Sequence, residues 1–166
     1  MDLAVSREGW AFWRGARLRC ALGRGGVSAR KCEGDGTTPV GSWPMRRLLY
    51  RADRVDRPTT FLAASPIAPD DGWCDAPADR NYNRPVKLPY AASAECLWRE
   101  DRIYDLVVPL GYNDAPAVPG AGSAIFLHLA QADFAPTAGC VALALPDLLA
   151  VLAEADETSL VVIEES

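Results

Sequence analysis

The chain contains one histidine, His128, and the nearest cysteine that follows it is Cys140. A cysteine is a strong nucleophile only as a thiolate, so it needs a base or a cation nearby. His128 is the only imidazole that the chain offers, so a nucleophilic Cys140 would have His128 as its base. The pair would support cysteine-dependent attack on a carbonyl group.

Residues 123–129 predict the strand that carries His128. Aliphatic residues at every second position form one face, and His128 belongs to the opposite row, as in a half-buried strand. Residues 131–137 include turn-forming residues and favour a reversal that returns Cys140 toward His128. We therefore expect imidazole and thiol to face each other across this turn.

Gly139 precedes Cys140 and lies among small residues, Thr137 and Ala138. Glycine allows a sharp turn whose N–H groups face a developing oxyanion, and small neighbours leave room for a substrate carbonyl. The alternative is structural, since free cysteines are often buried and a strand histidine is often a hydrogen-bonded core residue. Spacing alone leaves both open.

These residues resemble the YkuD-type L,D-transpeptidase catalytic domain, whose signature is a strand histidine followed by a Ser/Thr-His-Gly-Cys turn. Thr137, Gly139 and Cys140 match the turn, and His128 matches the upstream histidine. Residues 36–41, Gly-Thr-Thr-Pro-Val-Gly, resemble the hairpin near the start of that domain.

The resemblance covers nearly the whole chain, from Cys20 to Ile163, and indicates a divergent subgroup. Ala138 stands where the signature has its second histidine. Ala142 stands where the family usually has an arginine that, by the resemblance, helps to hold the donor peptide.

The resemblance implies that the substrate is a peptidoglycan stem peptide, cleaved between an L-residue carbonyl and a D-residue nitrogen. Cys140, activated by His128, would form a thioester that a diaminopimelate amine resolves into a crosslink. We lean toward 1,3 crosslinks over 3,3 crosslinks because of Ala142. Hydrolysis by an L,D-carboxypeptidase or endopeptidase is the alternative. A second alternative is a non-catalytic wall-binding module, in which the aromatic side chains of Trp73, Tyr82 and Trp98 bind glycan.

Residues 51–100 are expected to contain an insertion that caps the site, because a long irregular segment in a compact domain is often a substrate loop. We hypothesise that Asn83 and Arg84 replace the arginine missing at position 142. Arg84 would bind a peptide carboxylate through two parallel hydrogen bonds. A surface arginine that merely holds the loop is the alternative.

Tyr112 follows the strand predicted over residues 103–110 and resembles the tyrosine that many members of the family place over the donor. The alternative for such a tyrosine is packing. Thr137, in the cysteine turn, is assigned with Tyr112 to substrate binding.

The 166 residues, 49% of them hydrophobic, are enough for one domain, residues 1–166, with its own core. Thirteen glycines and thirteen prolines without periodicity favour turns and short strands. We expect a mainly β fold, an L,D-transpeptidase-like β-sandwich with a capping insertion at 51–100 and one or two short helices. A hairpin is predicted over residues 10–22, a helix over 88–100 and a closing strand over 158–163. Pro146 predicts the first turn of a further helix, with Leu148, Leu149 and Leu152 as its apolar stripe.

Charge is asymmetric, because residues 1–57 carry 12 Lys and Arg against 6 Asp and Glu, whereas residues 58–166 carry 5 against 16. Arg24, Arg30 and Lys31 lack a nucleic-acid motif and are expected on solvated strand faces, so no nucleic-acid partner is predicted. Five cysteines without a Cys-x-x-Cys pair and a single histidine make a metal site improbable. No cofactor is expected.

No run of residues reaches the length of a membrane span, and we recognise no signal peptide at the N-terminus. A wall substrate nevertheless predicts the periplasm or cell envelope, with peptidoglycan stem peptides as donor and acceptor. We expect a monomer.

Overall fold

The structure is a computed structural model that describes residues 1–165, and most of its regular elements are strands, which confirms the mainly β fold class. Ten strands form one large sheet. In spatial order they are β6 (Gly41–Pro44), β15 (Leu160–Ile163), β1 (Asp2–Ser6), β2 (Trp10–Trp13), β3 (Ala16–Ala21), β14 (Val141–Leu143), β13 (Phe126–Leu129), β12 (Leu106–Pro109), β7 (Leu48–Tyr50) and β8 (Ala64–Pro66).

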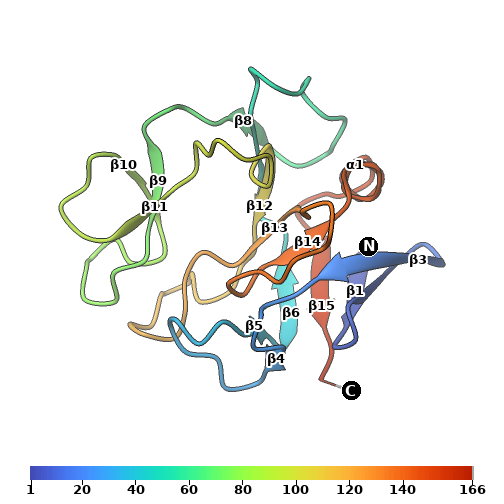
Figure 1. The fold of residues 1–166 in the computed structure, drawn as a ribbon, viewed down its shortest axis with the longest axis horizontal. Coiled ribbons are helices and arrows are strands. Elements are labelled where there is room, and N and C mark those ends of the chain that lie inside the picture. Colours follow the sequence, from blue (N-terminus) through green and yellow to red (C-terminus); the bar gives the residue numbers. More distant parts are fainter. Residues whose placement is uncertain (166) are drawn as a thin grey trace.

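Two smaller sheets and one helix complete the regular structure of the described residues. They are β9 (Asp71–Cys74) between β10 (Pro85–Lys87) and β11 (Ala94–Cys96), the pair β4 (Val27–Ser28) and β5 (Thr38–Pro39), and α1 (Leu145–Leu152). Figure 1 shows β9, β10 and β11 to one side of β12 and β13, with α1 on the other side.

The predicted hairpin of residues 10–22 is present as β2 and β3. Arg14 and Gly15 connect the two strands, and both have positive φ values, 49° and 81°. Two successive residues with positive φ are typical of the turn that matches the right-handed twist of a two-stranded ribbon. The closing strand is also present, as β15, which lies parallel to β1.

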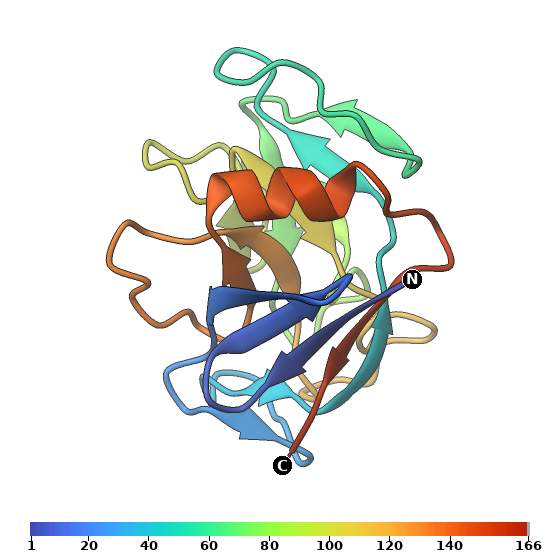
Figure 2. The ribbon, with the colours of Figure 1, turned by 90° about the vertical axis from the view of Figure 1, so that its right-hand side faces the viewer.

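The large sheet curls, so that β1, β2 and β15 contribute to the same apolar core as β12, β13 and β14. In Figure 2, α1 crosses one end of the curled sheet, and its buried residues join this core. Packing of the two halves of a curled sheet across one core is the architecture of a sandwich.

Two hydrophobic clusters lie on opposite faces of β12 and β13. Leu106 and Val108 join the main core, whereas Val107 joins a second cluster under β9 and β11. On β13, Leu127 faces the main core and Phe126 faces the second cluster. Side chains alternate across a strand, so each strand is buried on both faces.

The alternation predicted for the histidine strand is confirmed, but its half-buried character is wrong. His128 is 4% exposed because the sheet of β9, β10 and β11 covers its face of β13. The helix predicted over residues 88–100 is also wrong. β11 lies there instead and pairs with β9 through the register Glu95 opposite Trp73, so tertiary pairing overrides local helix propensity.

The helix predicted with Pro146 in its first turn is confirmed as α1, with one change in its apolar stripe. Leu148 and Leu152 are fully buried, as the stripe predicted, but Leu149 is 38% exposed and Val151 is buried instead. Among residues 1–165, no helix has the length and apolar character needed to cross a membrane.

Truncation of Leu148 tests the contribution of α1 to the core. We expect Leu148→Ala to lower the free energy of unfolding by about 2–5 kcal/mol, because the vacated volume cannot be refilled. Leu149→Ala, in the same helix but partly exposed, should cost less than about 1 kcal/mol. Chemical denaturation measures both, and equal losses would contradict the assigned helix face.

Candidate active site

A cavity of about 320 Å³ opens beside β13 and the turn that precedes β14. His128, Cys140 and Thr137 all line it, so three of the predicted site residues meet in one place. The pairing of β13 with β14 explains this arrangement. The strands are parallel and in the register His128 opposite Ala142, so Cys140 lies diagonally across from the imidazole.

The cysteine turn is built around Gly139, whose φ is +144°. A Cβ atom at this position would lie 2.8 Å from the backbone oxygen of Thr37, so no other residue fits without movement. Thr137 Oγ1 accepts a hydrogen bond from Gly139 N–H at 3.1 Å and donates one to Cys140 O at 2.7 Å. Cys140 leads directly into β14, and α1 follows that strand.

The backbone of the β13 segment holds the sulfur of Cys140. Phe126 N–H donates to Sγ at 3.3 Å, and the thiol donates to Ala124 O at 3.2 Å. The residue is 6% exposed, and burial raises the pKa of its thiol to about 12. The resting group at neutral pH is therefore a thiol.

His128 has a defined tautomer. Its Nδ1 lies 2.9 Å from the carbonyl oxygen of Leu129, and because a carbonyl only accepts, Nδ1 carries the proton. Nε2 therefore keeps its lone pair. Burial lowers the pKa of His128 to about 4, so the imidazole is neutral at pH 7.

The pair is thus neutral at rest, and its two members share a cavity without a direct hydrogen bond in the part of the chain that the structure describes. The sulfur bonds to backbone groups of Ala124 and Phe126 rather than to His128. Transfer of the thiol proton to Nε2 requires the S–H bond to turn away from Ala124 O.

One backbone donor next to the sulfur is free. Cys140 N–H has no acceptor among residues 1–165, whereas Gly139 N–H already donates to Thr137. A free N–H beside a nucleophile is the group that an oxyanion accepts from during acyl transfer.

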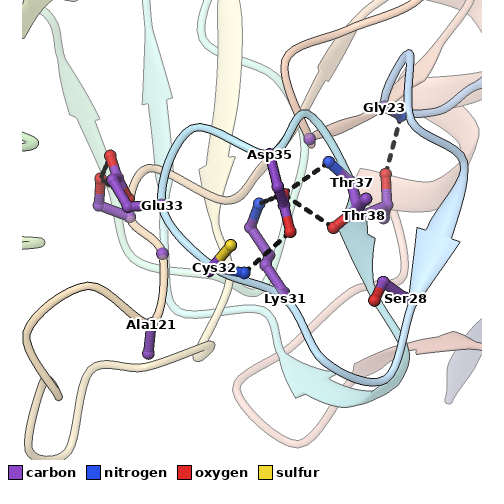
Figure 3. Close-up of polar contacts among 12 residues, drawn as sticks. Gly23, Ser28, Lys31, Cys32, Glu33, Asp35, Thr37, Thr38 and Ala121 are labelled. Carbon is purple, nitrogen blue, oxygen red and sulfur yellow. Dashed lines mark hydrogen bonds and ion pairs between the residues drawn. The ribbon is translucent and has the colours of Figure 1, made fainter.

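Lys31 also lines the cavity, and its prediction as a solvated residue is wrong, because its side chain is 4% exposed. Its ammonium donates to Asp35 Oδ1 at 3.0 Å, as Figure 3 shows. Burial alone would raise the pKa of Asp35, but hydrogen bonds from Cys32, Thr37 and Lys31 outweigh it and lower that pKa. An acidic residue four positions after a lysine, within a glycine-rich turn, was the available sequence signal.

Tyr104 and Glu95 form a further wall that sequence reasoning did not find. The hydroxyl of Tyr104 donates to Glu95, and the Tyr104 ring packs edge-on against the His128 ring at 5.2 Å between centroids. Burial raises the pKa values of both Glu95 and Tyr104. Tyr104 thus packs against the imidazole, and Glu95 holds the Tyr104 hydroxyl.

Arg99 lines the cavity from a loop that hydrogen bonds hold against the rest of the domain. Its guanidinium forms two hydrogen bonds with Asp101, and two other arginines hold the loop backbone. Arg51 donates to Arg99 O, and Arg54 donates to the carbonyls of Glu100 and Asp101. The loop is thus fixed by groups outside the cavity.

Asn83, predicted to bind substrate, is buried and lies outside the cavity lining. Its side-chain oxygen accepts from Trp73 Nε1 and from Ala124 N, and its amide donates to the carbonyls of Tyr112 and Asn113. These four bonds use the whole capacity of the amide. Asn83 therefore positions the segment that leads into β13, including the carbonyl that accepts from Cys140.

Tyr112 and Arg84 also lie outside the residues that line the cavity. Tyr112 donates to Ala121 O at 2.6 Å and packs edge-on against Trp43, whereas Arg84 is exposed. Their contacts with substrate stay predictions.

Comparison with known proteins gives one match. The model of a protein family, YkuD, described as the L,D-transpeptidase catalytic domain, matches residues 4–163. No curated protein and no solved structure matches the chain. The matched range begins earlier than Cys20, where the resemblance in sequence begins.

The low pKa of His128 predicts how stability changes with pH. The unfolded imidazole binds a proton below about pH 6.5. The folded one does so only below about pH 4, so stability falls as pH drops between these values and the histidine contributes no further change below them. We expect the wild type to lose about 3 kcal/mol more than His128→Gln over this window. Urea unfolding across pH 4–7 measures the difference, and parallel curves would contradict it.

Proposed function

The chain belongs to the L,D-transpeptidase catalytic domain family (YkuD), and on that premise we propose that it is a peptidoglycan L,D-transpeptidase with Cys140 as nucleophile. The observation that supports this most directly is the neutral pair in one cavity. The thiol of Cys140 and the unprotonated Nε2 of His128 are the acid and base that acyl transfer requires.

In the first half-reaction, Cys140 attacks the carbonyl of an L-residue, and His128 Nε2 takes the thiol proton. The carbonyl oxygen becomes an oxyanion and accepts from Cys140 N–H, with Gly139 shaping the turn that presents it. Collapse breaks the C–N bond, and His128 gives the proton to the departing D-residue amine. A thioester on Cys140 remains.

In the second half-reaction, a diaminopimelate side-chain amine of another stem attacks the thioester. His128 Nε2 accepts a proton from the attacking nitrogen and returns it to the sulfur as the C–S bond breaks. An amide crosslink and the free thiol result.

The donor bond is proposed to be the first L-to-D bond of the stem, which gives 1,3 crosslinks. Ala142 offers only a methyl group to the cavity, so the arginine that the resemblance associates with the usual donor is missing. The bond after the diaminopimelate L-centre, which gives 3,3 crosslinks, is the second candidate.

Residues 51–100 are proposed to act as a cap within a single domain, residues 1–166. Support comes from Asp75, Glu95 and Arg99, which line the same cavity as the cysteine turn. A protein that handles wall peptides is proposed to work in the periplasm or cell envelope.

Hydrolysis of the same thioester, as in an L,D-carboxypeptidase or endopeptidase, differs only in the final acceptor, water in place of the amine. A wall-binding module that uses exposed aromatic residues is less well supported. Trp73 is 7% exposed and Tyr82 is 3% exposed, so neither offers a face on which a sugar would stack.

Covalent capture at Cys140 tests the proposal. We expect wild type incubated with tetrapeptide muropeptides, or with a carbapenem, to gain one acyl adduct by intact mass, and Cys140→Ala to gain none. Cys20→Ala is the matched control, because Cys20 is also buried and its thiol pKa is likewise raised to about 12, but it lies in the main core. An adduct that survives in Cys140→Ala, or is absent from wild type, would refute the cysteine mechanism.

The mass of the products tests the type of crosslink. Dimers made from purified tetrapeptide muropeptides should have lost the donor stem beyond L-alanine, as 1,3 coupling requires. Loss of D-alanine alone would show 3,3 coupling instead, and monomers shortened by hydrolysis without dimers would show a peptidase.

A further inference from the structure

Lys31 places a buried positive charge beside the nucleophile turn. Its Nζ lies 3.3 Å from the point where Gly139 would carry a Cβ atom, so the ammonium lies close to the residue next to Cys140. The side chain is 4% exposed and lines the catalytic cavity. Burial of an ammonium is costly unless hydrogen bonds compensate for the lost water.

The hydrogen bonds of this ammonium are incomplete. A lysine offers three donors, and within residues 1–165 Nζ has one acceptor, Asp35 Oδ1. Asp35 in turn accepts from Thr37 N–H and Thr37 Oγ1 through the same oxygen, and from Cys32 N–H through the other. Figure 3 shows Asp35 as the hub of these bonds. Asp35 fixes the ammonium in place and leaves two of its donors for a ligand.

The proposed substrate carries a complementary group at the scissile bond. The residue on the leaving side is D-isoglutamate for one candidate donor bond and the terminal D-alanine for the other. In both residues, the carbon that bears the leaving nitrogen also bears a free carboxylate. A substrate carbonyl seated on the Cys140 sulfur therefore brings a carboxylate within a few bonds of the sulfur. A cation beside the nucleophile turn would meet it.

We propose that Lys31 binds the carboxylate of the D-residue on the leaving side of the scissile bond, and so selects donors that carry a free acid there. This inference rests on the proposed function, because it names the group that recognises the donor. A charge-assisted hydrogen bond in a buried cavity is a strong one and holds the leaving residue during attack.

Other cations near the site fit this task less well. Arg99 is 37% exposed and already gives two of its nitrogens to Asp101. Arg24 and Arg84 are exposed, and Arg84 lies outside the cavity lining. Lys31 combines burial, spare donors and a position close to the cysteine turn.

Paired donors test the role of Lys31. The probes are disaccharide tetrapeptides that carry the free acid, or the amide in its place, on D-isoglutamate or on the terminal D-alanine. We expect the wild type to distinguish acid from amide at the D-residue on the leaving side of the cleaved bond. At that position, kcat/KM for acylation of Cys140 should be about 10- to 100-fold higher with the free acid than with the amide. Lys31→Met should lose this preference, mainly through its rate with the free acid.

Lys87→Met is the matched control, because Lys87 is 64% exposed and pairs with Asp70 and Asp71 away from the cavity. It should keep the preference of the wild type. An equal loss by Lys31→Met with both donors would overturn the proposal and assign Lys31 to the oxyanion or to folding. If Lys31→Met does not fold, the wild type alone provides the test. Equal rates of the wild type with the acid and with the amide would then overturn the proposal.

Failure of this inference is distinct from failure of the proposed function. Wild type that acylates Cys140 without distinguishing the two donors is still a cysteine transpeptidase or peptidase, and only the role of Lys31 falls. Wild type that forms no acyl-enzyme with any donor refutes the function and the inference together.

Discussion

The site depends on the parallel pairing of β13 with β14. At the end of this ladder, Ala130 N–H donates a hydrogen bond to Leu143 O. Earlier on the same edge of β13, Phe126 N–H donates to the sulfur of Cys140 instead of to a backbone carbonyl. A backbone donor that would otherwise continue the sheet thus holds the sulfur of Cys140. Because the pairing register also places His128 opposite Ala142, one set of backbone contacts sets both the position of the thiol and that of its base.

In the proposed mechanism, burial keeps the site unreactive until a substrate arrives. It raises the pKa of Cys140 and lowers that of His128, so both shifts disfavour the thiolate–imidazolium pair in the empty cavity. On the proposed mechanism, the charged pair would become favourable only as a substrate carbonyl develops negative charge against Cys140 N–H. Proton transfer would then be coupled to attack, and the resting thiol would avoid the oxidation and alkylation to which an exposed thiolate is prone.

Sequence reasoning predicted the elements whose signal is local. The period-2 alternation around His128, the Arg14-Gly15 turn and the helix with Pro146 in its first turn each follow from residues within a few positions, and each is present. The segment of residues 88–100 was mispredicted because its strand exists only through pairing with β9. The burial of the His128 strand on both faces was missed for the same reason, since the covering sheet comes from a distant part of the chain.

Lys31 shows why the charges of the site were harder to predict than its nucleophile. Cysteine and histidine are rare enough to attract attention by type alone, whereas Lys31 is one of 17 basic residues and resembles a surface lysine in sequence. Its burial arises where two turns close on each other. Thr37 O abuts Gly139, and Arg24 N–H donates to Thr137 O, so the loop that carries Lys31 packs against the cysteine turn. A cation placed by such a contact sits on a loop rather than on β14. In the role proposed for Lys31, a chain with Ala142 would still present a positive charge to the leaving side of its substrate.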